Sequence, residues 1–172
     1  GPRATPATDG VNVYSVSLEG HLYCNDAATG RVVWYQYIPT AFGKDGGPYG
    51  FCSSPVIYNE TLLLDVGNML IALNKNDGSE RWRRVGGGVT SSMSVTPTIG
   101  SGGTAVFGSG TLIGVDLSDG SLLWQYAMGY EAMTSHILSG DQVVFSSSPE
   151  NGRLARLRSE EHTSELQSRQ VI

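Results

Sequence analysis

The stretch Asp26-Ala-Ala-Thr-Gly30-Arg-Val-Val-Trp34 decides the fold, because its pattern returns as Asn74-Lys-Asn-Asp-Gly78-Ser-Glu-Arg-Trp82 and as Asp116-Leu-Ser-Asp-Gly120-Ser-Leu-Leu-Trp124. In each copy, the Asp or Asn opens a turn by accepting backbone N–H groups, and the Gly lets the chain reverse through positive φ. The Trp follows four residues later, on the strand that the turn leads into. The Trp residues lie 48 and 42 residues apart, a period typical of a four-stranded propeller blade.

Short runs with strand character precede each Trp, and each run is bounded by turn residues. The predicted runs are 4–8, 11–16 and 21–25, then 53–58, 62–66 and 69–73, then 92–99, 104–108 and 111–115. A fourth unit covers 133–138, 142–147 and 153–157, but Thr163 stands where its Trp is due. No stretch shows a sustained helical period. We therefore predict an all-β, incomplete β-propeller of three four-stranded antiparallel blades plus most of a fourth, with blades at about 1–38, 51–85, 91–128 and 132–157.

A second mark repeats with the same period. Pro6, Pro55 and Pro97 each fall 27 or 28 residues before their Trp and follow a Thr or Ser, and His136 holds the corresponding place in the fourth unit. Proline is tolerated in a strand where no ladder donor is needed, and a crowded central channel leaves little room for larger side chains. We interpret these residues as members of the innermost strands.

The end of the chain departs from the repeat. Arg158–Ser168 resembles the in-frame translation of a sequencing adapter, so we expect 158–172 to be a non-native tail beyond a partial propeller at 1–157. The chain begins with Gly1, and we expect it to be a fragment whose missing blades belong to the same protein.

Composition and charge narrow the classes of partner. The formal net charge is −5, and no basic run is interleaved with aromatic residues, which argues against nucleic acid. No run of 18 apolar residues exists, so no membrane span is expected. Cys24 and Cys52 are the only cysteines, and either a disulfide or two free thiols fits the sequence. Without His or Cys at ligand spacing they form no zinc site.

Alternating loops of up-and-down strands lie on opposite faces of a propeller, and we expect a ligand on the more variable face. That face carries the links between blades, including the long link 39–50, and the loops between second and third strands. The candidate ligand contacts are His136, His21, Tyr49, Glu19 and Asp65. Four of them have a structural alternative: a surface His at position 21, a hydrogen-bonded structural His at 136, and solvated loop carboxylates at 19 and 65.

The repeat resembles the pyrroloquinoline-quinone-like β-propeller family. The resemblance rests on the turn-and-Trp pattern together with the preceding Leu22-Tyr-Cys-Asn-Asp26 and Leu70-Ile-Ala-Leu-Asn74, and it covers residues 1 to about 157. The same repeat builds quinoprotein dehydrogenases and the outer-membrane-protein assembly lipoprotein. The resemblance implies a periplasmic or extracellular location, and it implies that each Trp seals the contact with the neighbouring blade.

The favoured function is a non-catalytic propeller scaffold of an exported protein that binds a protein or a small ligand through loops on one face. The alternative is a fragment of a pyrroloquinoline-quinone-dependent alcohol or sugar dehydrogenase, in which the quinone and calcium would be cofactors. The chain has no adjacent cysteine pair of the kind that the dehydrogenases carry, no residues that match their calcium ligands, and no nucleophile turn. We therefore assign no catalytic residue, no metal ligand and no cofactor-binding residue to this segment.

Overall fold

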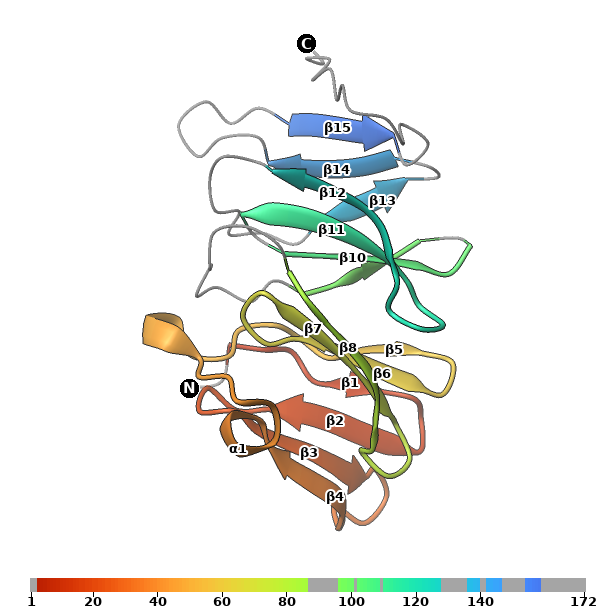
Figure 1. Cartoon of the computed structure of the whole chain (residues 1–172). Helices are drawn as coiled ribbons and strands as arrows, with labels where there is room; N and C mark the ends of the chain where they lie inside the picture. Colours follow the sequence, from red (N-terminus) through yellow and green to blue (C-terminus); the bar gives the residue numbers. More distant parts are fainter. Residues whose placement is uncertain are drawn as a thin grey trace.

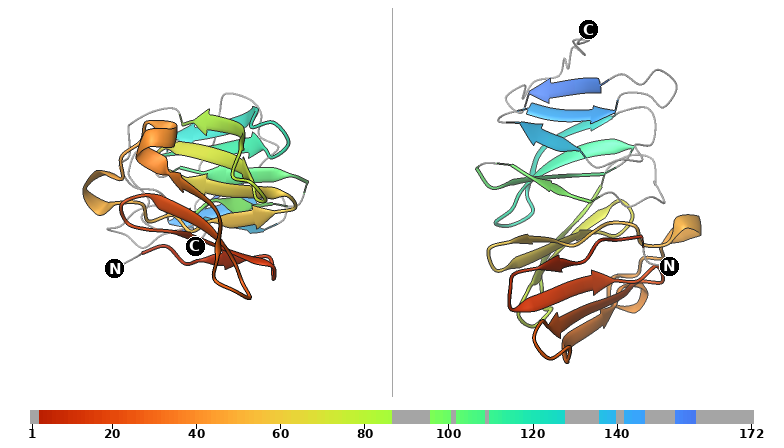
Figure 2. Two further views of the ribbon diagram at one scale, coloured as in Figure 1. Left: turned by 90° about the horizontal axis from the view of Figure 1, so that it is seen from below. Right: turned by 180° about the vertical axis from the view of Figure 1, so that it is seen from behind.

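The computed structural model describes residues 3–86, 96–100, 102–108, 110–127, 136–139, 142–146 and 154–158, and it places the strands in four antiparallel sheets. Three sheets have four strands and the last has three, so the predicted fold class is confirmed. The sheets follow one another in chain order, as Figures 1 and 2 show, and we call them blades 1 to 4.

Each blade is an up-and-down meander, so neighbouring strands in the chain are neighbours in the sheet. Blade 1 contains β1 (Ala7–Thr8), β2 (Asn12–Val16), β3 (His21–Asp26) and β4 (Val32–Tyr37). Blade 2 contains β5 (Val56–Tyr58), β6 (Thr61–Asp65), β7 (Met69–Asn74) and β8 (Glu80–Val85). Blade 3 contains β9 (Thr98–Ile99), β10 (Thr104–Phe107), β11 (Thr111–Asp116) and β12 (Leu122–Ala127). Blade 4 contains β13 (Ile137–Ser139), β14 (Gln142–Ser146) and β15 (Leu154–Arg158).

The innermost strands are shorter than the sequence predicted. Two of the residues that precede a Pro use their backbone to bridge blades, because Thr5 N–H donates to Ser54 Oγ at 2.9 Å and Ser54 N–H donates to Thr96 Oγ1 at 2.9 Å. The Pro that follows has no N–H to give to a ladder. Strand pairing in blades 1 to 3 begins only after the Pro, so Pro6, Pro55 and Pro97 lie just outside the innermost strands to which the sequence assigned them.

The repeated turns have the geometry that their residues predict. Asp26 Oδ1 accepts the backbone N–H groups of Ala28 and Thr29 at 3.1 and 2.7 Å, and Gly30 closes the turn at φ +72°. The corresponding glycines of blades 2 and 3 both have φ +74°. A register shift between the third and fourth strands recurs at the same place in all three blades.

The hydrophobic core lies between blades. One cluster joins blades 1 and 2, and a second joins blades 2 and 3. Blade 2 is therefore covered on both faces, which explains why all residues of β6 are buried and why β7 is an almost continuous apolar run. Blade 1 is covered on one face only, and its β4 exposes Val33, Tyr35 and Tyr37 on the other.

The link between blades 1 and 2 contains helical segments that the sequence analysis did not predict: α1 (Ile38–Phe42) and the 3₁₀ turn η1 (Gly47–Tyr49). Each is about one turn, too short to produce a helical period in the sequence. Pro39 lies in the first turn of α1, and Gly43 ends the helix in the left-handed region at φ +65°.

Candidate functional site

The two faces of the propeller differ in construction. On one face, the repeated Asp/Asn–Gly turns lie beside the turns between first and second strands, held by one backbone bond per blade. These bonds are Ala27 N–H to Val11 O, Lys75 N–H to Glu60 O and Leu117 N–H to Gly103 O, at 2.8, 3.1 and 2.8 Å. We call this the turn face, and we call the opposite face, which carries α1 and η1, the link face.

Each indole of blades 1 and 2 donates a hydrogen bond to the following blade. Trp34 Nε1–H donates to the carbonyl of Lys75 at 2.8 Å, and Trp82 Nε1–H donates to the carbonyl of Leu117 at 3.1 Å. Trp124 Nε1 is buried and meets no acceptor within the described part of the chain. The acceptors of Trp34 and Trp82 are the residues that directly follow β7 and β11.

The same indoles cover the turn glycine of the following blade. A Cβ on Gly78 would lie 2.8 Å from the Trp34 ring, and one on Gly120 would lie 2.5 Å from the Trp82 ring. On Gly30, whose turn no described Trp covers, an added Cβ would meet no described atom within 4 Å. The absence of a side chain at the turn thus lets the indole approach the backbone closely.

Three of the predicted ligand residues lie at the link-face end of blade 1. His21 stacks on Tyr37 with ring centroids 4.8 Å apart, and its Nδ1 lies 2.9 Å from the Tyr35 hydroxyl. Glu19 is exposed, and hydrogen bonds from its own backbone and from the Ser17 hydroxyl lower its pKa. Tyr49 is exposed on η1, which packs beside the β2–β3 turn.

The other two predicted ligand residues are buried. Asp65 ends β6 with a fully buried side chain, so it is not the solvated loop carboxylate that the sequence allowed. His136 is 3% exposed, its Nε2 lies 2.8 Å from the carbonyl of Gly108, and Thr98 Oγ1–H donates to its backbone carbonyl at 2.5 Å. Burial lowers the pKa of His136 and favours the neutral ring. The contacts of His136 tie blade 4 to blade 3.

Neither cysteine is part of a disulfide in the structure. Cys24 is buried on β3, directly opposite Trp34 in the sheet. Cys52 is half-buried, and its Sγ lies 3.3 Å from the carbonyl oxygen of Tyr49. Of the two alternatives left by the sequence, the structure has the thiols without a disulfide.

The residues that the structure describes include no group of three or more His, Cys, Asp or Glu side chains placed to hold a metal ion. Calcium takes six to eight oxygen ligands, and the turn carboxylates instead bind their own backbone, as Asp26 does. These residues do not fit a quinone–calcium centre, and no step of quinone chemistry is derived from them. Among them, no helix has the length and apolar character needed to cross a membrane.

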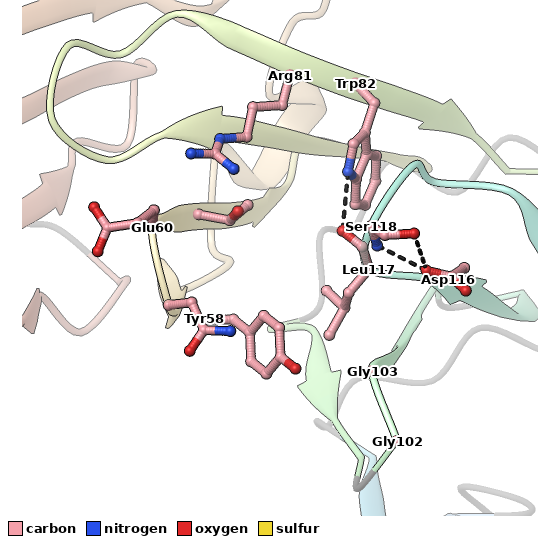
Figure 3. Close-up of a pocket in the computed structure, with 11 residues that line it drawn as sticks. Tyr58, Glu60, Arg81, Trp82, Gly102, Gly103, Asp116, Leu117 and Ser118 are labelled. Carbon is pink, nitrogen blue, oxygen red and sulfur yellow. Dashed lines mark hydrogen bonds between the residues drawn. The ribbon is translucent and has the colours of Figure 1, made fainter.

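A cavity of about 610 Å³ opens on the turn face between blades 2 and 3, and we call it the 2–3 notch. Arg81 and Tyr58 approach it from opposite sides, with Trp82 and Leu117 forming the wall beside them (Figure 3). The sequence analysis missed this site because it placed the ligand on the link face. Aligning the blades by their turns would have pointed to it, since Leu117 stands where blade 2 has Lys75.

Comparisons with known proteins agree with this architecture. The family model described as outer membrane protein assembly factor BamB matches residues 1–160. No curated protein is similar enough in sequence to count as a relative.

Solved structures give the same fold at low sequence identity. BamB from Moraxella catarrhalis is 15% identical, with a TM-score of 0.66 over 87% of this chain and 47% of its own. A quinohemoprotein alcohol dehydrogenase from Pseudomonas putida HK5 is 14% identical, with a TM-score of 0.74 over 93% of this chain and 33% of its own. The computationally designed Ika4 protein is 17% identical, with a TM-score of 0.67 over 92% of this chain and 93% of its own.

The chain thus spans about half the length of the BamB structure that it resembles. At these identities the solved structures show the fold alone. Together with the family model, they confirm the resemblance to pyrroloquinoline-quinone-like propellers that the turn-and-Trp pattern indicated.

Proposed function

Because the chain belongs to the family of the outer membrane protein assembly factor BamB, we propose that it is part of a non-catalytic β-propeller scaffold of an exported protein. Its partner is another protein of the cell envelope, bound through the link face. Location outside the cytoplasm and the binding role both belong to this proposal, and the family's description supports them.

The observation that carries the proposal is the ordered insertion on the link face. Backbone bonds from Ile38 N–H to Gly20 O and from Phe51 N–H to Leu18 O, at 2.9 and 3.0 Å, fasten both ends of the insertion to the β2–β3 turn. The side chains of Ile38, Phe42 and Phe51 are buried in the core between blades 1 and 2. A surface held rigid before binding loses little conformational entropy when a partner docks.

The insertion also presents residue types that protein interfaces favour. Tyr49 is 44% exposed at the tip of η1, and Tyr35 and Tyr37 are exposed on the neighbouring β4. Tyrosine combines a large apolar ring with a hydroxyl, and it is enriched in the core of protein interfaces.

Site-specific photo-crosslinking in cells tests this proposal. A crosslinking amino acid at position 49 of the full-length protein is expected to capture one defined envelope protein, and the same amino acid at the exposed turn-face position Thr29 is expected to capture none. Tyr37→Ala should weaken the capture from position 49. Equal yields from both positions, or no product from either, would count against a link-face scaffold.

A quinone-dependent dehydrogenase is the second candidate, favoured by the fold shared with the quinohemoprotein alcohol dehydrogenase from Pseudomonas putida HK5. The two functions separate in one assay on the full-length protein. Pyrroloquinoline quinone and calcium are added, and cofactor absorbance and dye-linked alcohol oxidation are recorded. The scaffold function predicts neither signal, and the dehydrogenase predicts both.

A further inference from the structure

The 2–3 notch has a counterpart between blades 1 and 2, and the two are built from equivalent positions. In the counterpart, the Lys75 ammonium lies 3.3 Å from Asp9 Oδ2 and 3.4 Å from Glu60 Oε1, so an ion-paired side chain occupies the space. By strand register, the positions of Asp9 and Lys75 are taken in the 2–3 notch by Tyr58 and Leu117. The position of Glu60 is taken by Gly103.

These replacements leave the 2–3 notch open. Leucine is shorter than lysine and carries no charge, and Gly103 removes a whole side chain from the rim. The cavity of about 610 Å³ lies within the range typical of small-ligand pockets. The strand register is therefore equivalent at the two interfaces, while the side chains at these three positions differ.

The charged side chains around the 2–3 notch determine whether it favours an anionic or a cationic ligand. Both carboxylates at the rim are held by neighbours: Glu60 contacts Lys75 and accepts from Asn76 Nδ2–H at 2.9 Å, and Asp116 Oδ1 accepts from the backbone N–H of Ser118 at 2.7 Å. In Figure 3 the Glu60 carboxylate points away from the cavity.

Arg81 is the charged group of the notch that remains to be paired. It is exposed, and no carboxylate lies within ion-pair distance of it among the residues that the structure describes. Glu60 and Asp77 interact with Arg81 only by electrostatic attraction at a distance. A guanidinium presents a planar fork of donors that matches a carboxylate with two parallel hydrogen bonds.

The rest of the wall is apolar or aromatic. The half-buried rings of Tyr58 and Trp82 and the side chain of Leu117 line the cavity beside Arg81. Aromatic rings of a ligand stack on such side chains, and the hydrophobic contact adds to the charge pairing. A ligand matched to this wall carries a ring or a branched alkyl group next to its anionic end.

We propose that the 2–3 notch binds a carboxylate attached to an apolar, preferably aromatic, group, with the carboxylate on Arg81 and the apolar group against Tyr58, Trp82 and Leu117. The ligand is either a free aromatic acid or the C-terminal carboxylate of a peptide that ends in an aromatic residue. This site lies on the turn face, so it is independent of the link-face scaffold function.

Titration followed by NMR of the 15N-tryptophan-labelled full-length protein tests the proposal. N-acetylphenylalanine should shift the indole signal of Trp82 saturably, with the signal assigned by its loss in Trp82→Phe. N-acetylphenylalanine amide and phenethylamine should bind at least tenfold more weakly. Equal affinity for the amide, or a preference for the amine, would overturn the carboxylate site.

Two further probes separate the sources of the carboxylate. Phenylacetate represents a free acid, and acetyl-Gly-Gly-Phe represents a peptide end. Tighter binding of the tripeptide assigns the site to a peptide terminus, and tighter binding of phenylacetate assigns it to a free aromatic acid. Binding of neither overturns the proposal.

Substitutions in the 2–3 notch test whether the change in the Trp82 indole signal comes from binding at this site. Arg81→Gln should weaken N-acetylphenylalanine at least tenfold, and Arg31→Gln, an exposed arginine on the blade 1 turn, should leave it unchanged. Leu117→Lys should abolish binding by filling the cavity as Lys75 fills its counterpart. The Trp82 indole bonds to the backbone carbonyl at 117, so its signal also reports whether this variant stays folded. Unchanged binding in either notch variant would contradict the site.

Discussion

The interface between blades 1 and 2 and the interface between blades 2 and 3 share the same indole contact but differ on the turn face. Both have an indole over a turn glycine and a donated bond to the residue after the third strand. Only the first has a half-buried lysine, Lys75, whose side chain is 15% exposed and pairs with Asp9 and Glu60. The repeated residues therefore build the ring, and the residues that differ between repeats decide what each interface does.

The two interfaces also differ in how deeply the indole is buried. Trp34 is 9% exposed within the cluster that joins blades 1 and 2, and Trp82 is half-buried against the next cluster. Trp82 lines the 2–3 notch. A solvent-accessible indole makes a smaller contribution to stability and a better contact for a ligand.

The largest effect is expected from removing the indoles. Trp34→Ala and Trp82→Ala should each lower the free energy of unfolding by about 3–5 kcal/mol, with Trp34→Ala at the upper end because its indole is more deeply buried. Urea denaturation followed by circular dichroism measures both. Equal costs, or an unchanged midpoint for Trp82→Ala, would show that burial between blades does not set their contributions.

A smaller loss of stability is expected from alanine substitutions at the turn glycines, and comparing two of them separates the indole contact from backbone strain. Gly30 and Gly78 have nearly the same φ, +72° and +74°, and only Gly78 lies under an indole. Alanine at either site pays the cost of the left-handed region, about 1–2 kcal/mol. Gly78→Ala should cost about 1–3 kcal/mol more than Gly30→Ala, because the new methyl group forces Trp34 to move. Thermal unfolding of the two variants gives the difference, and equal melting temperatures would argue against a tight indole contact.

Most of the fold could be predicted because the turn conformations of the repeat are determined by residues that lie close together in the sequence. A turn that needs positive φ favours glycine, and the side-chain oxygen that accepts its backbone N–H groups comes from Asp or Asn. The turns can therefore be recognised in the sequence without any knowledge of tertiary contacts. The short helix α1 was not predicted because its two buried residues, Ile38 and Phe42, are too few to form a period. The late start of the inner strands depends on a hydroxyl of the next blade, and the strand pattern in the sequence does not reveal such a partner.

The candidate site was much less predictable. Glu19, His21 and Tyr49 were placed on one face from loop alternation, and the structure does bring them to one end of blade 1. Asp65 was placed on the same face by the same argument, and His136 was chosen because it replaces the repeated Pro. Both are buried, because burial depends on packing across blades. The 2–3 notch depends on side-chain size at equivalent positions, which becomes visible only after the blades are aligned by register.

Unfolding measured at low pH should show which contacts of Asp9 stabilise its charged carboxylate at the interface between blades 1 and 2. Backbone N–H groups of Asn12 and Val11, at 2.8 and 3.0 Å from Oδ1, and the Lys75 ammonium lower the pKa of Asp9 from 3.8 to about 2, with the Asn12 bond as the largest cause. A lowered pKa stabilises the fold above pH 4, and this contribution is lost as the pH falls from about 4 towards 2.

In the corresponding experiment, Asp9→Asn should flatten that part of the pH dependence of unfolding, measured by urea denaturation at each pH. Lys75→Met should keep most of it, because the Asn12 bond remains. The same loss of pH dependence in both variants would show that the ion pair, and not the turn, holds the Asp9 carboxylate in its charged form.

The smallest effect should come from the bridges at the inner strands. Ser54→Ala removes the hydroxyl that accepts from Thr5 N–H, and it should cost about 0.5–1.5 kcal/mol, the net value of one hydrogen bond. Ser54→Thr keeps an acceptor at the same place and should cost less. Because Thr5 N–H loses its acceptor only in the alanine variant, its hydrogen exchange should accelerate there and not in the threonine variant. Unchanged exchange in Ser54→Ala would mean that the bridge between blades 1 and 2 rests on the indole side of the sheets rather than on the inner strands.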